Sequence, residues 1–175
     1  MILDVVRLTF FPALMAFAAT SDLITMTISN RISLLLSLGF VLLAVMGGMD
    51  GYTLLAHIGV ALGVLALTFG CFAMGWIGGG DAKLAAVIAL WFGFDHLVEY
   101  LVYASVIGGA LTLLILQFRQ WPLPRPISGQ IWLQRLHDTN GGIPYGIALA
   151  IGAMLIYPQT QWMQAVDLAR LTHWI

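Results

Sequence analysis

The sequence predicts an all-α, polytopic membrane protein, a single domain over residues 1–175 with about six transmembrane helices. Of its 175 residues, 61% are hydrophobic and only 9% are charged, and the mean hydropathy is +0.95. Because a soluble globular protein averages about 25% charged residues, this chain cannot cover a folded surface with polar groups. Long uncharged intervals separate the charged residues, and most approach the roughly 20 residues that a membrane-crossing helix needs.

The composition also excludes several other classes of protein. An intrinsically disordered chain has few apolar residues, and this chain has too many of them to stay solvated. Seven Lys and Arg against eight Asp and Glu give a formal net charge of −1, and the basic residues are scattered, which argues against a nucleic-acid-binding protein. The single cysteine, Cys71, excludes a disulfide framework and a multi-cysteine zinc site.

The first three spans are expected at 8–21, 32–49 and 52–74. The first contains Pro12, which a transmembrane helix tolerates, and Arg7 is expected to snorkel to the membrane surface at its end. A turn containing Gly and Asp at 47–51 separates the second span from the third. The glycine-rich run 75–80 ends the third span.

The last three spans are expected at 84–94, 100–118 and 143–157. The first of these is short, and a turn is expected after it at 95–99. A short helix at 131–136 precedes the final span. The tail at 159–175 is predicted to lie at the membrane interface, with Trp162 and Trp174 as anchors among the lipid headgroups.

The basic residues predict the orientation of the chain. With the N-terminus outside and six crossings, five basic residues lie in the cytoplasm and two outside, as the positive-inside rule favours. The five are Arg31, Lys83, Arg119, Arg125 and Arg135, and the two are Arg7 and Arg170. Residues 119–142 then form a cytoplasmic loop. If 84–94 did not cross, three of the five would move outside, so the count favours six spans.

Two carboxylates, Asp22 and Asp81, each abut a span in a stretch with few other charges. Asp22 ends the first span, and Asp81 directly follows the glycine run 78–80. The chain crosses the membrane twice between them, so both lie on the same face, and the basic residues make that face cytoplasmic. The alternative is that Asp22 only caps the next segment and that the glycine run is only a loop.

A pair of carboxylates at a membrane boundary has a definite chemistry. Held close together, the two groups share a proton near neutral pH, because both cannot ionise cheaply. Such a pair can activate a water molecule for attack on a peptide carbonyl, with one group acting as the base and the other as the acid. Gly78 and Gly80 have no Cβ atom and allow an extended substrate to approach the backbone closely.

Three motifs carry a resemblance to a known family. Gly78-Gly79-Gly80-Asp81 matches the G-x-G-D motif of membrane aspartyl proteases, and the run 78–84 resembles that of the type IV prepilin peptidases. Asp22 followed by Ile28-Ser29-Asn30-Arg31 resembles that family's Asp followed by Ile-Pro-Asn, with Ser29 in place of the usual Pro. Ile143-Pro144-Tyr145-Gly146 resembles the Pro-Tyr-Gly of the short tight-adherence (Flp) pilus branch.

The resemblance implies an enzyme of the inner membrane that removes the leader from type IV or Flp-type prepilins at the cytoplasmic face. Asp22 and Asp81 would be its catalytic pair, with no cofactor or metal. A prepilin, membrane lipid and the pilus assembly or secretion machinery would be its partners. Family members that also methylate the new pilin N-terminus carry an extra cytoplasmic region, usually with paired cysteines, which this chain lacks, so cleavage is predicted and methylation is not. Residues expected to bind substrate or shape the site are Asn30, Gly78, Gly79, Gly80, Lys83, Pro144, Tyr145 and Gly146.

Several alternatives stay open. Lys83 contacts the substrate or the catalytic carboxylate, or it is only a positive-inside anchor. The segment 144–146 bends the last span beside the aspartates, or it is a packing kink. His96 and Glu99 lie one helical turn apart, but a metal site needs three or four ligands. At the level of function, the alternatives are a small transporter or proton relay that uses the same two Asp residues as ion sites, and a related G-x-G-D protease with another substrate.

Overall fold

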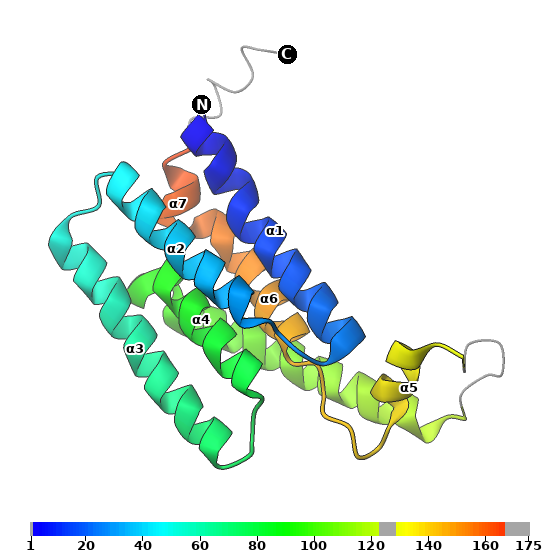
Figure 1. The fold of residues 1–175 in the computed structure, drawn as a ribbon. Coiled ribbons are helices and arrows are strands. Elements are labelled where there is room, and N and C mark those ends of the chain that lie inside the picture. The colour runs from blue at the N-terminus through cyan, green and yellow to red at the C-terminus, as the bar shows by residue number, and fades with distance from the viewer. Residues whose placement is uncertain (1, 123–128, 167–175) are drawn as a thin grey trace, which may run out of the picture.

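The computed structural model describes residues 2–122 and 129–166, and Figure 1 shows their arrangement. Within these residues the chain is helical and contains no strand, which confirms the all-α prediction. The helices are α1 (Ile2–Thr25), α2 (Asn30–Met46), α3 (Gly51–Ala73), α4 (Gly79–Gln120), α5 (Ile131–His137), α6 (Gly146–Ile156), the 3-10 helix η1 (Tyr157–Gln159) and α7 (Gln161–Gln164).

The hydrophobic exterior of the helices identifies a membrane protein. Three helices, α1, α3 and α4, are long and apolar enough to cross a bilayer, while α2 and the stretch Gly146–Gln159 are shorter apolar helices. Large hydrophobic side chains such as Leu34 and Leu67 point outward and are largely exposed, as expected for a surface that faces lipid. The number of crossings stays a prediction at six.

The longest helix, α4, reverses direction at Gly93. This residue has φ 61° and ψ −162°, a conformation that is open essentially to glycine alone. A straight helix of 42 residues would be about 63 Å long, yet Asp81 near its start and Arg119 near its end line the same cavity. Figure 1 shows the two parts of α4 running back past each other. The predicted turn at 95–99 is therefore wrong: one glycine makes the reversal, and the residues after it are helical at once.

Side chains from two other helices satisfy the backbone at this reversal. A break in a helix frees carbonyl groups in the preceding turn. His57 of α3 lies with Nδ1 2.7 Å from the carbonyl oxygen of Leu90, and because a carbonyl can only accept, Nδ1 carries the proton. Trp162 of α7 donates its indole N–H to the carbonyl of Trp91 at 2.7 Å. The break is thus held by α3 on one side and by α7 on the other.

Trp91 is the centre of the hydrophobic core. Its fully buried ring lies 5.0 Å from that of Phe11 and 6.1 Å from that of Phe40, measured between centroids. Its indole N–H donates to the carbonyl of Leu36. Aromatic rings at such distances and tilts attract one another in addition to burying apolar area. The core therefore ties together α1, α2 and the first part of α4.

The side chain of Trp162, in the described part of the tail, does not reach out to the lipid headgroups as predicted, and the interfacial position of the tail stays a prediction. Trp162 is only 3% exposed, and its ring packs 5.2 Å from that of Trp91. The prediction treated this tryptophan as a headgroup anchor, whereas its N–H is used inside the core, at the break in α4. Residues 167–175, including Trp174 and Arg170, lie outside the described residues, as does Arg125.

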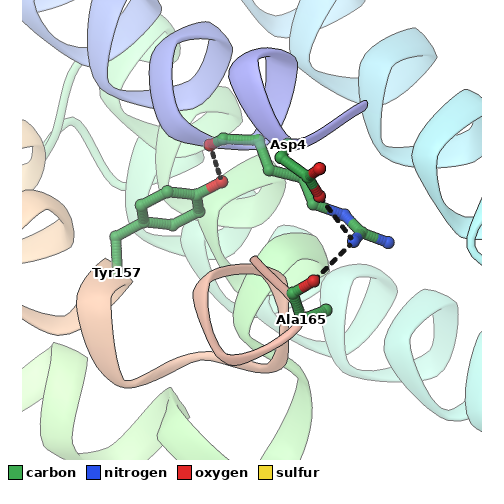
Figure 2. A network of polar contacts seen from close by, with 4 residues as sticks. Asp4, Tyr157 and Ala165 are labelled. Atoms are coloured by element: carbon green, nitrogen blue, oxygen red, sulfur yellow. Dashed lines mark hydrogen bonds and ion pairs between the residues drawn. The ribbon is translucent and has the colours of Figure 1, made fainter. Parts of the chain in front are cut away.

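Arg7 is also buried, at 8% exposure, rather than snorkelling to the membrane surface. Figure 2 shows the network that holds it. Its Nη1 donates to the carbonyl of Ala165 at 3.2 Å and lies 3.9 Å from Asp4 Oδ1, while the hydroxyl of Tyr157 donates to the Arg7 carbonyl at 2.7 Å. These contacts fasten the chain after α6 to the start of α1.

The opposite end of the helix bundle is where the predicted site residues gather. The end of α1, the starts of α4 and α6 and the end of α4 lie near one another there (Figure 1). The predicted short helix at 131–136 is present as α5, and it packs against α1 and α4. This end of the bundle carries the candidate site.

Candidate active site

Asp22 lies in the last turns of α1 and is almost completely buried, at 5% exposure. Its Oδ2 accepts a hydrogen bond of 2.8 Å from the backbone N–H of Gly146, the first residue of α6. A Cβ atom on Gly146 would lie 2.8 Å from the same oxygen. The absence of a side chain at Gly146 therefore allows α6 to bring a free N–H against this carboxylate.

Asp81 lies in the first turn of α4, directly after the helix begins at Gly78-Gly79. Its Oδ1 is buried and has no hydrogen-bond partner among the described residues. Its carboxylate interacts with the N–H groups of Gly78 and Gly146 and, through its charge, with Asp22. The Gly146 amide thus donates to Asp22 and lies near Asp81, so the two carboxylates are close together.

A cavity of about 840 Å³ opens beside the two aspartates. Its lining comes from the end of α1, the loop before α4, the second part of α4 and the segment before α6. The lining residues are Asp22, Met26, Gly75, Trp76, Ile77, Gly78, Asp81, Thr112, Arg119, Gly141, Gly142, Ile143, Pro144 and Tyr145. The two carboxylates therefore face a space large enough for a segment of a substrate chain.

A comparison with models of known protein families matches the part of the chain that contains both aspartates. The model of the type IV leader peptidase family matches residues 9–113, which include both aspartates. The chain belongs to the type IV leader peptidase family. No curated protein and no solved structure matches the chain. The resemblance to the type IV prepilin peptidases is thereby confirmed at the level of the family, and the chain is a peptidase in the general sense of that family.

In this leader peptidase, the segment 144–146 lies outside the residues that match the family, but it lies at the cavity. Pro144 is buried, and the Tyr145 hydroxyl packs so closely on Gly108 that a Cβ atom there would overlap it. The last span was expected to start at 143, with either a bend beside the aspartates or a packing kink at 144–146. Instead, α6 begins at Gly146, so the Pro-Tyr-Gly sequence leads into the helix and presents its first N–H to Asp22.

The three glycines before Asp81 have different surroundings. Gly78 lines the cavity, and a Cβ atom on it would lie 2.9 Å from Asp81 Oδ2. A Cβ atom on Gly79 would lie 3.2 Å from the ring of Phe72, and one on Gly80 would lie 3.1 Å from Ile28 Cβ. Gly79 and Gly80 thus let the first turn of α4 pack closely against its neighbours, while Gly78 leaves room for the carboxylate.

Lys83 and Asn30 do not line the cavity of the aspartates. The Lys83 Nζ donates to Asn30 Oδ1 at 2.8 Å, and both residues line a second cavity, separate from the one at Asp22 and Asp81. Their roles in cleavage stay predictions.

Arg119 was not predicted as a site residue. The sequence indicated it only as one of the five basic residues on the cytoplasmic side. Its Nε donates to the Leu136 carbonyl at 2.9 Å and its Nη2 to the Gly142 carbonyl at 2.8 Å. Arg119 therefore holds the loop that leads to Gly146, and it lines the cavity itself. No local motif marks Arg119, since it follows Asp81 by 38 positions. The two residues line the same cavity only because α4 reverses direction.

No group of three or more His, Cys, Asp or Glu side chains comes together within 2–122 and 129–166. His96 Nδ1 and Glu99 Oε2 lie 4.0 Å apart as a pair. They belong to the turn of α4 that follows the reversal, whereas Asp81 lies in its first turn.

Proposed function

We propose that this leader peptidase is a membrane aspartyl endopeptidase that removes the leader from type IV or Flp-type prepilins. Asp22 and Asp81 form its catalytic pair, at the cytoplasmic face of the inner membrane. Residues 1–175 act as one integral membrane peptidase domain. The single observation that carries this proposal is that Asp22 and Asp81 lie close together beside the Gly146 amide, on the wall of a substrate-sized cavity.

The geometry supports hydrolysis by shared acid–base chemistry. A single proton belongs to the pair as a whole. The unprotonated carboxylate takes a proton from a water molecule, whose oxygen bonds to the scissile carbonyl carbon, while the protonated one gives its proton to the carbonyl oxygen. When the tetrahedral intermediate collapses, the C–N bond breaks, the leaving amine takes the proton of one aspartate, and a hydroxyl of the intermediate gives its proton to the other, which restores the singly protonated pair. These steps need no metal and no cofactor.

The distribution of charge supports a cytoplasmic active site. Arg119 lines the cavity of the aspartates, and Arg135 lies with residues at the end of α1. Arg31 and Lys83 lie in the first turns of α2 and α4, at the same end of the bundle. Arg7 lies near the start of α1, at the end opposite to Asp22. Basic residues are enriched on the cytoplasmic side of membrane proteins, so the aspartate end faces the cytoplasm.

The decisive experiment measures leader cleavage of a co-expressed type IV or Flp-type prepilin. Asp22→Asn and Asp81→Asn each keep the size of the side chain but cannot exchange a proton, so each is expected to reduce cleavage by at least about 100-fold. Asp138→Asn is the matched control, because this carboxylate is exposed; it is expected to cleave like the wild type. Normal processing by both Asp22 and Asp81 variants, when these are inserted in the membrane at wild-type levels, would refute the mechanism.

The same assay separates the alternatives. A transporter or proton relay yields no shortened prepilin, and membership of a peptidase family favours cleavage over transport. A protease for other leaders would process a non-pilin membrane substrate and leave the prepilin intact. Mass analysis of the mature N-terminus also tests methylation, and an unmethylated amine is expected.

A further inference from the structure

A second cavity, of about 450 Å³, lies between α2, α3 and the first part of α4. Its charged residues, Arg31 and Lys83, come from the first turns of α2 and α4. Its apolar wall includes Leu34, Leu65 and Val87. We call this cavity the α2–α4 groove. The cleavage site does not use it, because neither catalytic aspartate lines it.

The charges and the apolar wall of the groove are ordered along the helix axes. On α2, Leu34 and Ser37 follow Arg31 by three and six positions, which places them one and two turns deeper in the membrane. On α4, Val87 follows Lys83 by four positions and lies one turn deeper. The groove thus has a cationic end at the level of the aspartates, and its α2 wall runs about 9 Å from there toward the bilayer centre, past Leu34 to Ser37.

The cationic end is not neutralised within the described part of the chain. The Lys83 ammonium donates to Asn30 Oδ1, a neutral acceptor. The side chain of Arg31 is exposed and forms no ion pair with a described residue. No carboxylate lines the groove, so an anion that enters meets two positive charges and no negative one.

We propose that the α2–α4 groove binds an anionic phospholipid, with the phosphate between Arg31 and Lys83 and an acyl chain along Leu34, Leu65 and Val87. A free phosphate would use the charges but not the apolar wall. A zwitterionic lipid would bring its own cation to the two that are present. An anionic phospholipid matches both features at the depth where the membrane supplies it.

Native mass spectrometry of the whole chain in detergent tests this proposal. The protein is titrated with phosphatidylglycerol and, separately, with phosphatidylcholine of the same acyl chains. Each basic residue near an anionic lipid is expected to contribute a factor of about five in affinity. Arg31→Gln and Lys83→Gln are therefore each expected to weaken phosphatidylglycerol binding about five-fold and to leave phosphatidylcholine binding unchanged.

Arg135→Gln is the matched control, since it removes a cation from the same end of the protein but outside the groove; its phosphatidylglycerol affinity is expected to equal that of the wild type. Lys83→Gln also removes the hydrogen bond from the Lys83 ammonium to Asn30. Arg31→Gln is the cleaner variant, because the described hydrogen bond of Arg31 is donated by its backbone N–H. Equal affinity for the two lipids, or an equal loss in Arg135→Gln, would overturn the proposal. So would equal binding of dihexanoyl and long-chain phosphatidylglycerol, because the apolar wall would then be unused.

Discussion

The reversal of α4 depends on one glycine, and Gly93→Ala tests how strongly. At φ 61° and ψ −162°, an alanine is expected to add about 1–3 kcal/mol of backbone strain. Its Cβ would also lie 2.8 Å from Cε1 and Nε2 of His57. The imidazole must then move away from the Leu90 carbonyl, and a buried acceptor left unpaired costs about 1–3 kcal/mol.

The two effects together lower the free energy of unfolding by about 2–6 kcal/mol. For a chain of this size, each kcal/mol shifts the Tm by about 2–4 °C, so a fall of at least about 4 °C is expected. Thermal unfolding in detergent, followed by circular dichroism, measures it. The double variant Gly93→Ala with His57→Ala removes the steric contact, so its Tm is expected to fall by less than the sum of the two single changes.

Gly59→Ala is the matched control for this prediction. Gly59 lies within α3, and nothing lies within 4 Å of a Cβ atom built on it. Alanine stabilises the interior of a helix by about 0.5–1 kcal/mol relative to glycine, so the Tm is expected to rise by about 1–4 °C. If Gly93→Ala unfolds at or above the wild-type temperature, the reversal of α4 does not require glycine at this position.

Three further predictions concern the site and one helix end. Gly146→Ala is expected to push the carboxylate of Asp22 aside and to lower kcat about 100-fold, whereas Gly142→Ala, at a cavity position with open space around its Cβ, is expected to change kcat little. Met26 has φ 55° and lines the cavity, so Met26→Gly should raise the Tm by removing left-handed strain but lower kcat/KM by removing an apolar wall; a parallel change in both would contradict this. Hydrogen bonds from the first turn of α3 hold the pKa of Asp50 below its ordinary 3.8, so its contribution to stability is present above that pH and is lost as the pH falls through the lowered pKa. The Tm of Asp50→Ala is therefore expected to lie below that of the wild type at pH 7 and to converge with it in acid.

The sequence was sufficient to predict the helical class, and it singled out two aspartates and a Pro-Tyr-Gly segment that the structure places at one cavity. These predictions rest on local signals, since an uncharged run of about 20 residues or a carboxylate after three glycines is visible without the fold. Arg119 was missed because its position depends on the reversal at Gly93. A lone glycine within a helical pattern does not predict a break, because a helix tolerates glycine at a modest cost in stability.

Arg7 and Trp162 were misplaced for a related reason. General rules put arginine and tryptophan near span ends at the lipid surface. Here both side chains find hydrogen-bond acceptors inside the protein, at the Ala165 and Trp91 carbonyls. Those acceptors exist because the chain after α6 folds back over the end of the bundle, which no single segment of sequence reveals.

The amide of Gly146 has one further consequence for the proposed chemistry. During hydrolysis the negative charge passes from one aspartate to the other and back. A backbone N–H that donates to Asp22 and lies near Asp81 can stabilise the charge on either carboxylate without any movement of a side chain. It is rigid, since it begins a helix, and it carries no acidic proton of its own to compete with the pair. The first residue of α6 thus provides a fixed hydrogen-bond donor beside the two aspartates between which the proton is proposed to move.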